Sequence, residues 1–126
     1  MTQAQRRLFL IQSLLQEHPA YRDLGIPAEP ESQRQLLRGL MNIRAPQHAE
    51  ADFLQMQDAY LQGENAAKGI TDVAELTPIQ PGLYLWQGDI TTLQCDAIVN
   101  AANSGMTGCY VPNHRCIDNA IHTFAG

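Results

Sequence analysis

The hydrophobic pattern of the chain changes near residue 75, and this change sets what the chain can fold into. Before that point apolar residues recur every three or four positions, which is the spacing of an amphipathic helix. After it, short apolar runs lie between turns that contain glycine or proline, which is typical of strands. The sequence therefore predicts a helical extension over residues 1–75 and an α/β unit over residues 76–126.

The first helix is predicted from its cap and its apolar face. Thr2 and Gln5 have the spacing of a capping box, and Pro19 lies just past the expected end. Four apolar residues fall on one face at helix spacing: Leu8, Ile11, Leu14 and Leu15. We expect this face to belong to a core.

Two further helices are predicted, from Ser32 to about Asn42 and from about Gln47 to Ala67. Ser32 and Gln35 repeat the capping-box pattern. The apolar positions of these helices are Leu36, Leu37, Leu40, Met41, Phe53, Leu54, Tyr60 and Leu61. Methionines and a tyrosine at this spacing are interpreted as core residues rather than as a ligand-binding set.

Two strands and one helix are predicted beyond residue 75. Leu83–Trp86 is a short apolar run after Pro-Gly, and Asp96–Asn100 contains the β-branched residues that a buried strand favours. The stretch from Cys116 to Phe124 keeps a period of 3.6 and predicts a helix. Together these elements indicate an α/β class with a partly parallel sheet.

Composition narrows the functional classes. The chain has 126 residues, enough for one domain, and a net charge of −5, which gives no attraction to nucleic acid or to an anionic membrane. It contains no apolar stretch long enough to span a bilayer and no secretory signal pattern. Three cysteines are an odd number, which argues against a disulfide framework. We therefore expect a cytoplasmic chain with reduced thiols, available for metal binding or catalysis.

The densest set of reactive residues is Cys109, His114 and Cys116, which lie within eight positions. Zinc accepts sulfur and nitrogen ligands in a tetrahedron, and three protein ligands would leave the fourth position open, as in catalytic zinc sites. The alternative is two reduced cysteines and a surface histidine that are neighbours by chance. His122 is a poor fourth ligand because it would lie inside the predicted helix, and Cys95 is interpreted as a buried small apolar residue.

Polar residues flank the second predicted strand. Gly88 before Asp89 would let the backbone approach a ligand closely, and the Asp89 carboxylate could accept a hydrogen bond from a purine amino group. Asn100 and Asn103 lie at and beyond the end of the strand, where α/β sheets place ligands. The alternative is that both asparagines only form turns.

Asp118 falls in the first turn of the last predicted helix. One explanation is a favourable contact between its charge and the helix dipole. The other is a functional arrangement of a metal, the Asn103 amide and the Asp118 carboxylate, joined by a short loop. The same helix end also has free N–H groups that suit an anion.

Several motifs in order resemble the macrodomain family. They are Gly-Asp-Ile-Thr at 88–91, Asp-Ala-Ile-Val-Asn-Ala-Ala-Asn at 96–103 and Ile-Asp-Asn-Ala-Ile-His at 117–122. The inserted Gly-Cys-x4-His-x-Cys is similar to the zinc-dependent branch of that family, and the helical N-terminus is similar to the extension of that branch. The resemblance covers residues 82–126, about a third of the chain, and implies the first part of a three-layer α/β/α fold.

The resemblance also implies roles for individual residues. Asp89 would bind the adenine amino group, and Ile90 would present its backbone to the adenine. Asn103 would hold the distal ribose, and zinc would be bound by Cys109, His114 and Cys116. The loop formed by Cys116, Ile117 and Asp118 would contact the diphosphate and the distal ribose, and Asn103 and Asp118 would be the catalytic residues.

The implied function is zinc-dependent hydrolysis that removes ADP-ribose from mono-ADP-ribosylated proteins, at an ester to an Asp or Glu side chain. The partners would be ADP-ribose or the modified protein. The motifs of the family's later strands and of its glycine-rich diphosphate loop have no counterpart here, so we expect a truncated chain with weak or no activity. We also expect association through the edge of an incomplete sheet. The alternatives are an ADP-ribose-binding module without turnover and an inactive fragment with a helical interaction domain.

Overall fold

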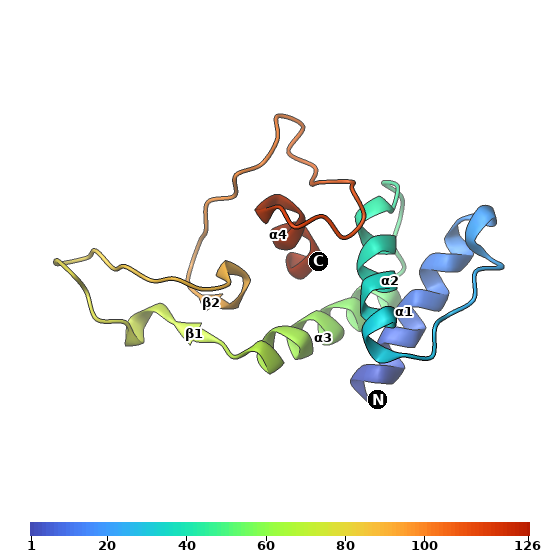
Figure 1. Cartoon of the computed structure of the whole chain (residues 1–126), viewed down its shortest axis with the longest axis horizontal. Coiled ribbons are helices and arrows are strands. Elements are labelled where there is room, and N and C mark those ends of the chain that lie inside the picture. Colours follow the sequence, from blue (N-terminus) through green and yellow to red (C-terminus); the bar gives the residue numbers. More distant parts are fainter.

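The computed structural model describes all residues from Met1 to Gly126 (Figure 1). Three α-helices, α1 (Gln3–Glu17), α2 (Pro30–Ile43) and α3 (Ala51–Lys68), pack together at one end of the molecule. From α3 the chain runs through an extended part and returns in α4 (Ile117–Ala125), which lies beside α2 and α3. The remaining elements are three 3-10 helices and two strands: η1 (Pro19–Tyr21), η2 (Val73–Glu75), η3 (Ile90–Thr92), β1 (Thr71–Asp72) and β2 (Leu93–Gln94).

Helix α1 forms as its sequence predicts. The Thr2 hydroxyl accepts the backbone N–H of Gln5, and the Gln5 side chain accepts the backbone N–H of Thr2, so the capping box is confirmed. The helix ends at Glu17, where His18 adopts an extended conformation ahead of Pro19. These local bonds satisfy N–H groups that a helix start leaves without partners.

The predicted start of α2 is wrong by two residues, and its predicted capping box is absent. The cap is Glu29, whose carboxylate accepts the backbone N–H groups of Glu31 at 2.9 Å and Ser32 at 2.6 Å. Pro30 follows as the first helical residue, where its fixed φ suits a helix and its missing N–H costs nothing. Helix α3 also starts later than predicted, at Ala51, and stops at Gly69, whose φ of +90° breaks the helix.

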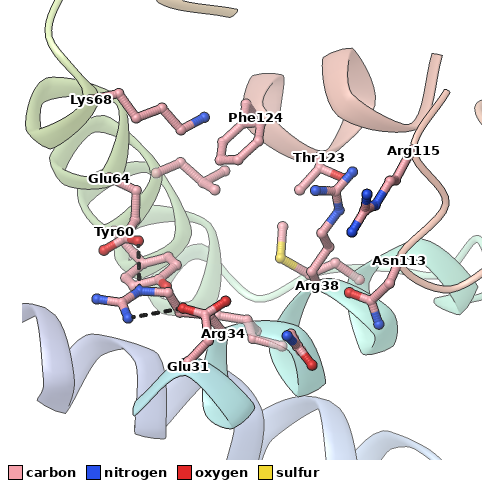
Figure 2. Close-up of a pocket in the computed structure, with 14 residues that line it drawn as sticks. Glu31, Arg34, Arg38, Tyr60, Glu64, Lys68, Asn113, Arg115, Thr123 and Phe124 are labelled. Carbon is pink, nitrogen blue, oxygen red and sulfur yellow. Dashed lines mark hydrogen bonds and ion pairs between the residues drawn. The ribbon is translucent and has the colours of Figure 1, made fainter. Parts of the chain in front are cut away.

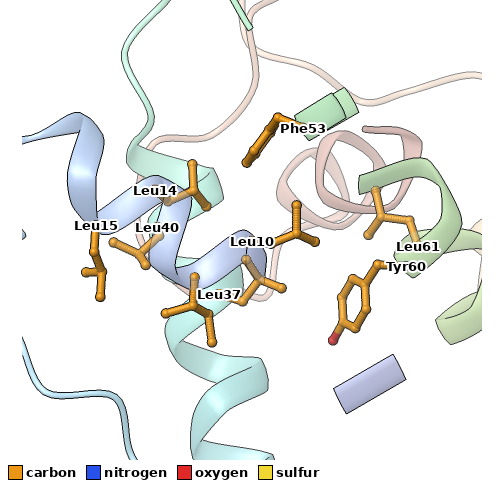
Figure 3. Packing of buried hydrophobic residues seen from close by; sticks show 9 residues of the cluster. Leu10, Leu14, Leu15, Leu37, Leu40, Phe53, Tyr60 and Leu61 are labelled. Carbon is orange, nitrogen blue, oxygen red and sulfur yellow. The ribbon is translucent and has the colours of Figure 1, made fainter. Parts of the chain in front are cut away.

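The hydrophobic core lies among α1, α2 and α3 (Figure 3). Nine apolar side chains are buried there: Leu10, Ile11, Leu14, Leu15, Leu37, Leu40, Phe53, Tyr60 and Leu61. Met41 packs against this cluster, as the core interpretation predicts, and so does Met56, whereas Leu54 is exposed. Each buried leucine contributes about 1.5–3 kcal/mol relative to an exposed one, so this cluster is the main source of stability.

The two predicted strands, Leu83–Trp86 and Asp96–Asn100, are wrong. Both segments lack strand structure, apart from an isolated bridge between Gln80 and Leu83. The sheet consists of β1 and β2 alone, parallel, with Thr71 opposite Leu93. A strand needs a neighbour for its backbone hydrogen bonds, and neither segment has one. Most side chains in these segments are accordingly exposed, with Val99 at 90%, whereas Trp86 and Asn100 are half-buried.

The last helix is confirmed almost to the residue. Helix α4 spans Ile117–Ala125, and the Cys116 thiol caps it by accepting the backbone N–H of Asn119 at 3.4 Å. Cys95, predicted to be buried, is exposed, because the strand expected to bury it does not form.

The chain as a whole is mainly helical with a small parallel sheet, an α/β-like arrangement. None of its helices is both long and apolar enough to cross a membrane.

Candidate metal and ligand site

The structure brings Cys109, His114 and Cys116 together. Their potential ligand atoms all lie within 4.8 Å of one another, and Cys109 Sγ is 3.6 Å from His114 Nδ1. Zinc–sulfur and zinc–nitrogen bonds in a tetrahedron would separate S and N by about 3.5 Å. The donor set and its spacing therefore fit a zinc ion. His122 is not part of the group, as its place inside α4 predicts.

Backbone turns make this convergence feasible. Asn113 has a φ of +56°, and the His114 N–H donates to the Val111 carbonyl at 3.1 Å, which folds the loop back. Gly108 has a φ of +98° and faces the His122 ring, which a Cβ at this position would approach to 3.1 Å. Glycine is therefore the residue that both the conformation and the space allow at the start of the loop.

Cys116 has a second contact that suits a metal-binding sulfur. As the N-cap of α4 it lies at the positive end of the helix, with the N–H of Asn119 directed at its sulfur. Cysteine binds metals through this same sulfur atom, as the thiolate.

Asp118, two residues beyond Cys116, is a buried carboxylate that contacts the side chains of Asn100 and His122. It is 5% exposed, and its Oδ1 accepts Asn100 Nδ2 at 2.8 Å and lies 3.0 Å from His122 Nδ1. The other end of the Asn100 amide, Oδ1, is buried and has no hydrogen-bond partner. A buried acceptor without a partner is costly, so it is available for a donor of a bound molecule. The sequence marks Asn100 as a strand-end amide, but its pairing with Asp118 carries no sequence signal.

Asn103 contacts the segment of the loop that leads to the metal-binding cluster. Its Nδ2 donates to the Gly108 carbonyl at 3.0 Å, and its Oδ1 accepts the Gly105 N–H at 3.0 Å. The side chain thus braces the segment that leads into Cys109. In this structure Asn103 is a turn former, the alternative that the sequence left open.

Asp89 lies on a different element, as the N-cap of η3. Its Oδ1 accepts both the N–H of Thr91 at 2.9 Å and the Thr91 hydroxyl at 2.6 Å, and Lys68 is 3.3 Å from Oδ2. Partial burial raises the pKa of Asp89, but the bonds from Thr91 and the charge of Lys68 outweigh it and hold the pKa below its usual value. The carboxylate is therefore ionised at neutral pH.

The two groups of predicted site residues lie toward opposite ends of α4. Ile90 lines an apolar pocket of about 270 Å³ together with Ile121 and Phe124, near the end of the helix. Lys68, which pairs with Asp89, also lies 3.2 Å from the centre of the Phe124 ring. The metal ligands are at the start of α4, whose nine residues span about 13 Å. A ligand that reaches both groups must be elongated.

A larger cavity, of about 520 Å³, lies among α2, α3 and α4 (Figure 2). It is lined by the charged residues Glu31, Arg34, Arg38, Glu64, Lys68 and Arg115. Neither the three metal ligands nor Asp118 lines this cavity. We therefore place the candidate site at the cluster of metal-binding side chains and not at the larger cavity.

Sequence reasoning missed three polar residues that contact the metal-binding loop. Arg38 and Asn42 on α2 bond to the loop or to α4, and Asn119 on α4 bonds to the backbone of the loop. Arg38 and Asn42 are four positions apart, so they share one helix face. Their partners are some 70 to 80 positions away in the chain, and nothing local marks the pairing.

Comparison with known proteins shows which class of protein this chain resembles. No family model matches the chain. A protein-ADP-ribose hydrolase of Treponema medium is 56% identical over 130 residues, which cover all of this chain and 50% of that protein. A protein of the same name from Staphylococcus aureus strain MRSA252 is 44% identical over 119 residues, covering 94% of this chain and 44% of that protein.

Over the matched part, this chain is therefore similar to proteins named protein-ADP-ribose hydrolase. The chain spans about half the length of the curated relatives it matches. The relatives are hydrolases by name.

Proposed function

We propose that this chain binds zinc through Cys109, His114 and Cys116 and contributes these residues to a protein-ADP-ribose hydrolase of the macrodomain type. The observation that carries the proposal is the three-ligand cluster at the N-terminus of α4, two residues from the buried carboxylate of Asp118. Three ligands leave one coordination position for a water or a substrate oxygen. The names of the relatives supply the substrate class, which is ADP-ribosylated protein.

The positions of the two residue groups support ADP-ribose as the ligand. ADP-ribose carries adenine at one end and the distal ribose at the other, with the diphosphate between them. Asp89 and Ile90 would hold the adenine near the end of α4, where the apolar pocket beside Ile90 suits a flat ring. Cys116, Ile117 and Asp118 would contact the diphosphate and the distal ribose at the start of the helix, where free N–H groups suit an anion.

Bound zinc would supply a Lewis acid that polarises an oxygen. Asp118 would position the attacking water at the ester between the ribose and an Asp or Glu side chain. Asn100 and His122 hold the carboxylate of Asp118 in one orientation. The free Oδ1 of Asn100 would accept a hydrogen bond from the ribose, and Asn103 would support the loop beside it.

The test is hydrolysis of a mono-ADP-ribosylated protein, measured with this chain, its Cys109→Ser variant and its Cys95→Ser variant. We expect Cys109→Ser to lose zinc and any hydrolysis together, and Cys95→Ser to behave as the parent chain. Loss of zinc without any change in hydrolysis would show that the mechanism is wrong.

Binding is measured separately, by calorimetry with ADP-ribose. Asp89→Asn should weaken binding, whereas the charge-matched control Asp23→Asn, on an exposed loop, should not. Tight binding by the parent chain with no release of ADP-ribose from protein would favour the alternative of a binding module without turnover.

A further inference from the structure

The loop that carries the metal ligands has no regular secondary structure between Gln94 and the start of α4. A segment of this kind loses conformational entropy when it is ordered, and this loss weakens metal binding if it occurs on binding. Contacts that order the three ligand residues before the metal binds would reduce that cost. Side chains from α2 and α4 meet this loop at several points.

Helix α2 contributes Arg38 and Asn42. Arg38 Nη2 donates to the backbone carbonyl of the ligand residue His114 at 3.1 Å. Asn42 Oδ1 accepts the backbone N–H of Asn113 at 3.0 Å, and its Nδ2 donates to the Thr123 hydroxyl of α4 at 3.0 Å. Figure 2 shows Arg38 directed toward Thr123 and Arg115, on the side of α2 that faces α4.

Asn119 joins these contacts into one network. It is completely buried, and its Nδ2 donates to the carbonyls of Cys109 at 3.3 Å and Val111 at 3.1 Å. Its Oδ1 accepts Arg38 Nη2 at 2.9 Å and Nε at 3.3 Å. Its backbone N–H donates to Cys116 Sγ at 3.4 Å. Each of the three ligand residues therefore has a hydrogen bond to Arg38 or Asn119.

The close approach of α2 to the loop is a second, independent observation. Gly39 is buried, and a Cβ on it would lie 3.2 Å from Asn113 Nδ2 and 3.7 Å from the Pro112 side chain. The helix surface beside Arg38 is thus shaped to let the loop pack directly on it.

We propose that Arg38, Asn42 and Asn119 are positioning residues that preorganise the metal loop, so that the N-terminal helices set the affinity of the chain for zinc. This inference rests on the proposed function, because it requires the cluster to bind a metal. Arg38 is central because its fork reaches both Asn119 and His114, which the single ammonium of a lysine cannot do in the same way.

The experiment compares the full chain with Arg38→Lys and with the matched control Arg34→Lys. Arg34 lies one turn earlier on α2 and pairs with Glu31 and Glu64, away from the loop. Cobalt(II) is titrated into each metal-free protein and followed by its thiolate charge-transfer absorption, and zinc affinity is then measured by displacement of the cobalt. Circular dichroism shows whether the helices are retained, and hydrogen exchange of residues 109–116 is recorded without metal.

Arg38→Lys should weaken metal binding by about 10–100-fold, the range for partners of metal ligands, and should speed exchange in the loop before metal is added. Arg34→Lys should match the parent chain in both. Asn42→Ala removes two hydrogen bonds from the half-buried face of α2 that meets the loop and α4. It should show the same defects in smaller degree, which keeps the test open if Arg38→Lys loses its fold.

Equal metal affinity and equal loop exchange in the parent, Arg38→Lys and Asn42→Ala proteins would overturn the positioning role while leaving the metal site intact. A parent chain that gives no cobalt absorption would overturn the metal site itself. The two failures are therefore distinguishable.

Discussion

The two halves of the molecule bury different kinds of side chain. All nine buried apolar residues of the core lie in α1, α2 and α3. Between Gly69 and Gly126 the buried residues are Thr92, Gly108, Asp118, Asn119 and Thr123, none of which is a large hydrophobe. The helical half holds itself together by the hydrophobic effect. The second half contacts it mainly through polar groups: Arg38 bonds to His114, Asn42 bonds to Thr123 and Lys68 pairs with Asp89, while Phe124 packs against the core.

This difference indicates which interactions stabilise each half of the molecule. Burial of apolar area is cooperative and does not depend on a ligand. Polar contacts contribute less each, about 0.5–1.5 kcal/mol net, and they gain from a bound metal or ligand that holds the same groups. We therefore expect the helical half to stay folded under conditions in which the second half responds to zinc and ADP-ribose.

The largest expected effect comes from paired deletions of apolar side chains in the two halves. Leu37→Ala removes a side chain that is 2% exposed and should lower the free energy of unfolding by about 2–5 kcal/mol. Val99→Ala, at a position that is 90% exposed, should change it by no more than about 0.5 kcal/mol. Urea unfolding followed by circular dichroism measures both, and similar losses would break the comparison.

The next effect concerns the metal. Cys116→Ser should weaken zinc binding by at least about 100-fold, beyond the effect of losing an outer partner of a ligand. Serine is also a good N-cap, so α4 should be retained and the loss can be assigned to the missing sulfur. Cys95→Ser, at an exposed cysteine outside the cluster, is the control. Equal affinities for the two variants in a competition assay with a chelating dye would contradict the assignment of the ligands.

A smaller effect distinguishes the observed caps from the predicted ones. Thr2→Ala removes the cap of α1 and should cost about 0.5–2 kcal/mol of stability. Ser32→Ala should cost no more than about 0.5 kcal/mol, because Glu29 rather than Ser32 caps α2. Thermal melts of the two variants measure both losses of stability. A loss above about 0.5 kcal/mol for Ser32→Ala would instead favour the capping box that the sequence predicts.

The smallest effect is a pH dependence at Asp89. Its pKa is lowered in the folded state, so its contribution to stability is present above the unfolded value of about 4 and is lost as the pH falls through the folded value. Asp89→Asn should remove this dependence, so the melting temperatures of parent and variant should converge as the pH is lowered from 5 to 2.5. A difference that stays constant over this range would mean that the charge of Asp89 has no stabilising role.

Sequence reasoning succeeded for the cap of α1, whose residues are three positions apart, and it grouped Cys109, His114 and Cys116, which lie within eight positions and come together in the structure. It did not identify Glu29 as the cap of α2 or Cys116 as the cap of α4, although both contacts are local. It failed for Leu83–Trp86 and Asp96–Asn100, because strand propensity says nothing about whether a neighbour is present to pair. It also missed the bonds of Arg38 and Asn42 to the loop, which join residues far apart in the chain.

The measurement that tests the central claim most directly is zinc stoichiometry of the purified chain after exhaustive dialysis, with Cys109→Ser alongside. We predict close to one zinc per parent chain and close to none in the variant. A value near zero for the parent chain would contradict the account, because the cluster of Cys109, His114 and Cys116 would then be an arrangement of side chains that does not hold a metal.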